Sequence, residues 1–245
     1  MQRAATIVMS LLALAFVVSS LMFATSPLPS QDLPWQIAAL MERTDPDGLA
    51  TIYLRPQQPA MWLLLIGLWL SLILFVARRL WPSDTRPDLD LADLVLLISG
   101  LAAGAIWPWV AIGAPLAGFL LSVLMLMALI AAARRTFSDG RLARHPFLGI
   151  LAGWTTVVTF AAFGSFLTDI TPIPVEVTTL VVAVLTCAAA IAIQIRIPHN
   201  AAYTITVMFA LLATAATTIE TNPPIAVIAV LSMAALTFLL VRVTT

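Results

Sequence analysis

Few side chains in this sequence combine the residue types and spacing that chemistry requires. The two histidines, His145 and His199, each lie next to a proline. A neutral imidazole there could ligate the metal of a haem or a chlorophyll, or simply form a hydrogen bond at a helix end. Four aspartates in one short stretch could catch a cation, although arginines lie among them (Asp84, Asp88, Asp90, Asp93). Because no catalytic arrangement of acids, bases and nucleophiles can be assembled, we expect a protein that is not an enzyme and has no metal site.

Aromatic and small residues are more informative than the ionisable ones. Trp154 follows Gly149 and Gly153, whose spacing of four residues allows close approach of another helix. Thr155 and Thr156 come directly after the tryptophan. An indole beside a close helix contact, with hydroxyls nearby, could line a ligand pocket. Ordinary packing, with the threonines bonded to their own helix backbone, is the alternative.

Eight long apolar stretches must position these residues. Each meets or nears the roughly 20 residues needed to span hydrocarbon, and Asp93 and Glu176 lie only at span entrances. The fold class is therefore all-α, a polytopic helical membrane bundle in one domain, residues 1–245. The expected spans are 4–24, 60–77, 91–111, 116–133, 146–167, 175–195, 200–219 and 224–241.

Composition excludes several classes of function. The chain is 61% hydrophobic and 10% charged, whereas soluble domains contain about 25% charged residues. Proton relays and ion-coupled transporters need ionisable groups at bilayer depth, which these spans lack. All twelve basic residues are arginines and the formal net charge is zero, so we expect no nucleic-acid partner. The single cysteine, Cys187, allows no disulfide framework.

The arginines predict the orientation. Cytoplasmic loops carry the excess of basic residues. With an even number of spans and a cytoplasmic N-terminus, only Arg43 and Arg55 fall outside. Both would lie in the external loop, residues 25–58, which includes a short amphipathic segment, 35–41. We therefore expect a bacterial inner-membrane protein with both termini cytoplasmic. The other ten arginines would be cytoplasmic (Arg3, Arg78, Arg79, Arg86, Arg134, Arg135, Arg141, Arg144, Arg196 and Arg242).

One run of residues resembles a known family. The stretch from His145 to Phe163 is similar to a segment of the longer relatives in the tryptophan-rich sensory protein family, also called TspO/MBR or the translocator protein group. The matching positions are Pro146, Phe147, Gly153, Trp154, Thr155, Val157 and Thr159. Residues 105–109 with 121–126, and residues 196–210, fit two further family segments in the same order. The resemblance covers roughly residues 60–215.

The resemblance implies a sensory or regulatory protein that binds a hydrophobic ligand, with a tetrapyrrole among the candidates. The ligand-binding residues would then be Trp154, Tyr203, Thr155, Thr156, Trp107 and Trp109, with Gly149 and Gly153 in helix packing. Helix direction indicates that Trp154 pairs with Tyr203, whereas Trp107 and Trp109 guard the opposite mouth or contact a partner.

A structural role is the alternative function. The chain could be an accessory subunit packed against a larger membrane complex, such as a photosynthetic pigment-protein complex. The two functions differ in where the tryptophan and small-residue faces point. They face inward around a cavity in a ligand-binding protein, and outward in a subunit.

Overall fold

The computed structural model describes residues 2–26, 53–56, 58–80, 90–138, 146–197, 200–218 and 223–244. These residues form helices and connections, with no strand among them. The eight helices of these ranges are α1 (Gln2–Thr25), α4 (Pro59–Leu80), α5 (Leu91–Gly113), α6 (Pro115–Ser138), α7 (Pro146–Ile170), α8 (Val175–Arg196), α9 (Ala201–Thr218) and α10 (Pro223–Thr244). Most of the predicted external loop, His145 and His199 lie outside the described residues.

Helix length confirms a multi-pass membrane bundle. Seven of the described helices are long and apolar enough to cross a membrane. The predicted span 200–219 corresponds to α9, which has 18 residues and is therefore about 27 Å long at 1.5 Å per residue. Helix α9 is the shortest of the eight helices named above, and its length is slightly less than the roughly 30 Å thickness of a hydrocarbon core.

Prolines and caps set the helix boundaries. Four helices begin at a proline, where the missing amide N–H costs no internal hydrogen bond (Pro59, Pro115, Pro146 and Pro223). Helix α5 instead begins after Asp90, whose carboxylate accepts a hydrogen bond from the Leu91 amide. These signals explain why the helices start close to the positions that the apolar stretches predict.

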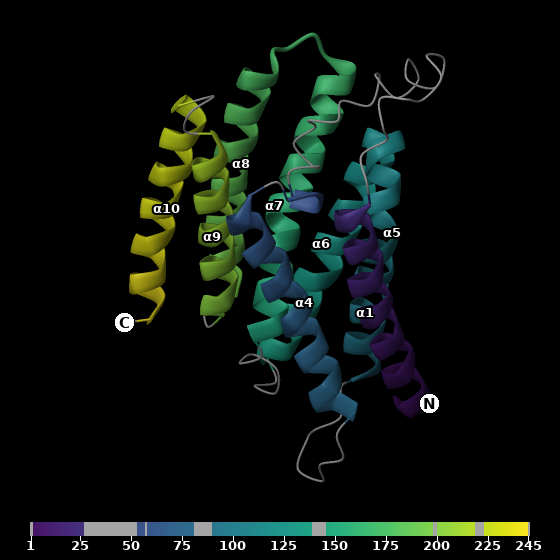
Figure 1. The fold of residues 1–245 in the computed structure, drawn as a ribbon. Coiled ribbons are helices and arrows are strands. Elements are labelled where there is room, and N and C mark those ends of the chain that lie inside the picture. The colour runs from purple at the N-terminus through teal and green to yellow at the C-terminus, as the bar shows by residue number, and fades with distance from the viewer. Residues whose placement is uncertain are drawn as a thin grey trace, which may run out of the picture.

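Helix α7 is the centre of the bundle (Figure 1). Within its membrane-spanning window 83% of the residues are buried, against 28% to 44% in the other six long spans. It packs against α4, α6, α8 and α9. Helices α8 and α9 both pack against α10 as well, so that α7, α8, α10 and α9 form a ring of four. Helices α1 and α5 pack together on the other side of the molecule.

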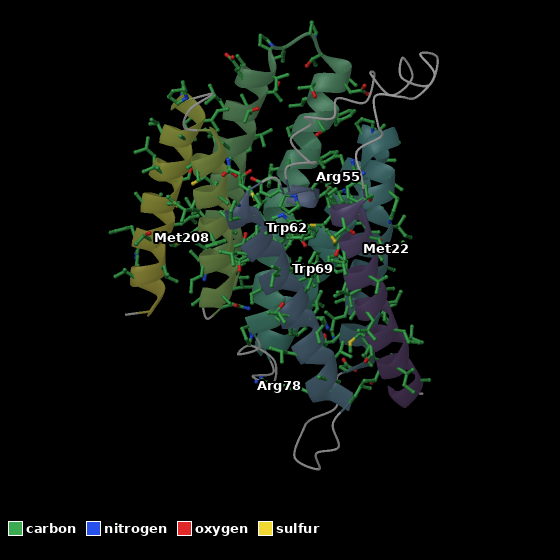
Figure 2. The ribbon with its side chains drawn as sticks, in the orientation of Figure 1. Met22, Arg55, Trp62, Trp69, Arg78 and Met208 are labelled. Atoms are coloured by element: carbon green, nitrogen blue, oxygen red, sulfur yellow. The ribbon has the colours of Figure 1, made fainter. Side chains whose placement is uncertain are left out.

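The two chain ends lie at the same end of the bundle (Figure 1). Helices α4, α6, α8 and α10 all run toward that end and carry arginine in the last turn, where a cation complements the helix dipole. Arg55 lies toward the opposite end from Arg78 (Figure 2). The described arginines are thus segregated as the sequence predicts.

Candidate ligand-binding site

The small-residue face of α7 contacts α9. A Cβ atom added to Gly153 would lie 2.8 Å from the carbonyl oxygen of Tyr203, and one added to Gly149 would lie 2.8 Å from its backbone nitrogen. Real Cβ atoms essentially never approach other heavy atoms so closely. Only glycine at both positions lets the two backbones come together, which places Tyr203 directly against α7.

The threonines after Trp154 bond to their own helix. Thr155 donates to the Leu151 carbonyl at 2.7 Å, and Thr156 donates to the Ala152 carbonyl at 2.8 Å. The Thr156 hydroxyl is also 3.1 Å from the Tyr203 hydroxyl, and either oxygen can be the donor in that contact. Both threonines are fully buried. Neither therefore has a free proton with which to orient a ligand.

Trp154 packs against aromatic rings from two other helices. Its ring makes edge contacts with Phe16 of α1 at 5.8 Å and with Trp107 of α5 at 6.1 Å between centroids. The indole Nε1 is buried without a hydrogen-bond partner. The predicted pairing of Trp154 with Tyr203 in a ligand site stays a prediction, since the Tyr203 hydroxyl contacts Thr156 and the Trp154 ring contacts aromatic rings of α1 and α5.

Trp107 and Trp109 also have separate environments. Trp107 is fully buried and donates to the Gly118 carbonyl at 2.9 Å. Trp109 is 52% exposed and donates to the Ser19 hydroxyl at 2.9 Å, with its ring edge against Phe23. Two residues apart on a helix, they point in different directions. Their predicted role, at the opposite mouth or in contact with a partner, stays a prediction, and of the two only Trp109 has an exposed side chain.

A cavity lies elsewhere, inside the ring of four helices. Its volume is about 40 Å³. Seven lining residues are aliphatic (Val157, Ala161, Val182, Ala183, Leu211, Ile225 and Ala229) and four carry hydroxyls (Tyr53, Thr179, Thr186 and Thr214). Thr179, Ile225 and Thr214 are near the start of α8, the start of α10 and the end of α9. The cavity is therefore closer to the end of the bundle opposite the chain termini.

The sequence interpretation missed this site. A usable signal was present in α8, where Thr179 and Thr186 are seven residues apart and so share one face of an otherwise apolar helix. Tyr53 carried no such signal, because it lies in the connection before α4. Its hydroxyl is 2.7 Å from the Thr214 hydroxyl, and the side chain is only 8% exposed.

The ionisable residues do not form a metal site in the described part of the chain. No group of three or more histidine, cysteine or acidic side chains could hold an ion there. Asp90 and Asp93 instead contact Arg135 of α6, each at 3.0 Å. These two acids, half of the predicted cluster, therefore connect α5 to α6.

The fold defines an all-helical, multi-pass membrane protein. A family model described as "TSPO-like protein" matches residues 52–242, which is more than half of the chain, and the chain therefore belongs to the TSPO-like family. No curated protein matches the chain, and no solved structure does. The matched region includes α4 to α9 and α10 up to residue 242, whereas α1, which supplies Phe16, precedes it.

A tetrapyrrole fits neither this cavity nor the position around Trp154. Pockets for drug-sized molecules enclose about 300–1,000 Å³, whereas this cavity holds about 40 Å³. The other candidate position, around Trp154, is filled by Phe16 and Trp107. Neither position has room for a macrocycle.

Proposed function

We propose that this protein is a non-enzymatic, TSPO-like membrane protein that binds a hydrophobic ligand in a sensory or regulatory role. The observation that carries the proposal is the cavity inside the ring formed by α7, α8, α10 and α9. Its lining is aliphatic apart from four hydroxyls, which is the composition of a site for an apolar molecule with one polar handle. A purely structural subunit requires no internal cavity.

We further propose that the protein lies in a bacterial inner membrane with cytoplasmic termini. The support is the arginine distribution, with ten of the twelve assigned to the side of the termini. The cavity would then be nearer the periplasmic side. A ligand could reach it from the outer leaflet or the periplasm.

A cavity-filling variant tests the binding proposal. Ala229 lines the cavity and is 1% exposed, so Ala229→Leu should remove the space for a ligand. Ala235 of the same helix is exposed, so Ala235→Leu adds the same atoms outside the cavity and is the matched control. The measurement is thermal unfolding in lipid nanodiscs with and without a panel of aliphatic, aromatic and tetrapyrrole compounds.

Three results are informative. Stabilisation by a panel compound that Ala229→Leu abolishes and Ala235→Leu retains supports ligand binding in the cavity. Equal stabilisation of both variants would exclude this cavity as the site. If no compound stabilises the protein and it co-migrates with a large complex in mild detergent, the accessory-subunit alternative replaces the proposal.

A further inference from the structure

The four hydroxyls of the cavity come from opposite sides of the helix ring. The ring helices pack in the cyclic order α7, α8, α10 and α9, so that α8 and α9 are opposite members. Thr179 and Thr186 belong to α8, whereas Thr214 belongs to α9 and its hydroxyl is 2.7 Å from that of Tyr53. Counted from the connection between the two helices, Thr214 is 13 residues along α9, whereas Thr186 and Thr179 are 10 and 17 residues along α8. The two α8 hydroxyls therefore lie on either side of the Tyr53–Thr214 pair in depth.

The volume of the cavity matches water. A site needs roughly 10–15 Å³ to hold one water molecule, whose share of liquid volume is about 30 Å³. The cavity has about 40 Å³, so about one to three water molecules fit. Cavities lined only by aliphatic side chains stay dry, because a buried water needs two to four polar partners. The four hydroxyls of this lining can supply those partners.

The α8 threonines can accept hydrogen bonds from water. The Thr179 hydroxyl donates to the Val175 carbonyl at 2.8 Å, and the Thr186 hydroxyl donates to the Val182 carbonyl at 2.7 Å. A carbonyl oxygen only accepts, so the hydroxyl protons lie in these two bonds. Each threonine oxygen retains lone pairs for a further bond. A water molecule in the cavity can therefore donate to both.

The Tyr53 hydroxyl can bond to water whichever way its own contact is arranged. Either Tyr53 or Thr214 can be the donor in the contact between their hydroxyls. If Tyr53 donates, its oxygen keeps a lone pair for a water proton, and if Thr214 donates, the Tyr53 proton is available to a water oxygen. Water both donates and accepts, so it complements either arrangement.

We infer that this cavity is an internal water-binding site, in which one or more ordered water molecules connect Thr179 and Thr186 of α8 to the Tyr53 hydroxyl opposite. The waters join two helices that are opposite in the ring, through oxygens that already have one partner each. The inference does not depend on the proposed ligand-binding function. It adds that a hydrophobic ligand entering this cavity displaces water, which gains affinity where that water is poorly ordered.

X-ray radiolysis footprinting tests the inference in nanodiscs. Irradiation turns water into hydroxyl radicals, which oxidise the side chains next to it, and mass spectrometry measures the rate at each residue. The chain has two tyrosines. Tyr53 lines the cavity and is only 8% exposed, so bulk solvent reaches little of it. Tyr203 is fully buried and is not part of the lining, so its rate is the internal control for a dry position and for intact packing.

Two kinds of variant separate cavity water from bulk solvent. Ala229→Leu fills the cavity, and Ala235→Leu adds the same atoms outside it. Replacing Thr179 and Thr186 together by valine removes two oxygens at nearly constant volume, and it keeps the test available if the leucine variant does not fold. Its control is Thr237→Val on α10, because Thr237 is exposed and donates to the carbonyl of its own helix residue Met233.

We expect Tyr53 to be oxidised much faster than Tyr203 in the unmodified protein. Ala229→Leu and the double valine variant should each remove most of this oxidation, whereas Ala235→Leu and Thr237→Val should retain it. Oxidation of Tyr53 as slow as that of Tyr203 would mean a dry cavity and would overturn the inference. Oxidation that either cavity variant leaves unchanged would also overturn it. A dry cavity can still take an apolar ligand, so these outcomes leave the proposed function to its own stabilisation experiment.

Discussion

At the residue scale, the tryptophans show how a polar atom is satisfied in an apolar bundle. Trp69 donates to the Ser20 hydroxyl at 2.6 Å, Trp107 to the Gly118 carbonyl and Trp109 to Ser19. Trp154 has no such partner and instead makes two perpendicular ring contacts. Perpendicular aromatic contacts place a positive ring edge against a negative ring face, which is a favourable arrangement for buried rings.

The contact between α7 and α9 gives a prediction for glycine substitution. Gly153→Ala places a methyl group 2.8 Å from the Tyr203 carbonyl oxygen, a backbone atom that can move only if α9 moves. We expect a loss of about 1–3 kcal/mol in the free energy of unfolding, as at other overpacked sites. The control is Gly67→Ala on α4, where no atom lies within 4 Å of the added Cβ. Alanine there should be neutral or stabilising by up to about 1 kcal/mol. Equal unfolding curves for the two variants in detergent would contradict the close contact.

At the element scale, α1 is held to the family-matched helices by specific polar and aromatic contacts. Ser20 accepts from Trp69 of α4, Ser19 accepts from Trp109 of α5, and Phe16 contacts Trp154 of α7. The Ser19 hydroxyl also donates to the Ala105 carbonyl of α5 at 2.5 Å. Helix α1 therefore packs on the bundle as an integral part of it, although it lies outside the matched region.

The bond between α1 and α4 can be tested by removing its acceptor. Ser20→Ala leaves the Trp69 Nε1 buried without a partner, because Trp69 is only 8% exposed. Interhelical hydrogen bonds in membranes contribute roughly 1 kcal/mol, so we expect destabilisation of about that size. Ser71→Ala is the control, since the Ser71 hydroxyl donates to the Leu68 carbonyl of its own helix. The comparison requires reversible unfolding in mixed micelles. A larger effect at Ser71 than at Ser20 would refute this role for Ser20.

The segment before α4 connects the two sides of the molecule. Tyr53 contacts Thr214 of α9 at the cavity. Two residues later, the Arg55 guanidinium lies 4.6 Å from the centre of the Phe23 ring of α1 and donates to the Phe23 carbonyl at 3.4 Å. A ligand that rearranges Tyr53 would therefore also act on a segment that contacts α1.

Burial of Tyr53 predicts how this segment responds to pH. The phenol pKa rises from 10.0 to about 12 because burial disfavours the phenolate. The folded state therefore binds the proton more tightly than the unfolded state. The resulting stabilisation is fully present below pH 10 and is lost as the pH rises through about 12. In a Tyr203→Phe variant, which leaves one tyrosine, phenolate absorbance should appear with a midpoint near pH 12. A midpoint near 10 would mean that Tyr53 is solvated.

The helices could be predicted from the sequence because their signals are local. Charge-free length defines the spans, and prolines such as Pro115 and Pro146 mark where they begin. Which helices pack together could not be predicted in general, since apolar residues surround each span and hydrophobicity does not distinguish an inner face from a lipid-facing one. Gly149 and Gly153 were an exception, because only small residues permit the contact they make. The cavity depends on four helices and Tyr53 together, and no local pattern encodes that combination.

At the scale of the whole molecule, charge and topology agree. Helices α4, α6, α8 and α10 end in arginine at the end of the bundle that holds both termini, whereas Arg55 lies toward the other end. At the end of the bundle that holds both termini, Arg135 contacts both Asp90 and Asp93. These contacts neutralise part of the acidic charge, so that the other arginines make the net charge of this end positive. Loops rich in arginine tend to stay on the cytoplasmic side during membrane insertion, which supports the proposed orientation.

Cysteine labelling tests the orientation. Replacing the single native cysteine by Cys187→Ser gives a background in which one new cysteine reports one position. Pro172, in the connection between α7 and α8, and Leu80, at the end of α4, are both exposed and lie at opposite ends of the bundle. We expect Pro172→Cys, and Asp47→Cys in the predicted external loop, to react with a membrane-impermeant maleimide in intact bacterial spheroplasts. Leu80→Cys should react only after the membrane is permeabilised. The reverse pattern would place the termini and the arginines outside, because the even number of spans keeps the two ends of the chain together, and the cavity would then be nearer the cytoplasmic side.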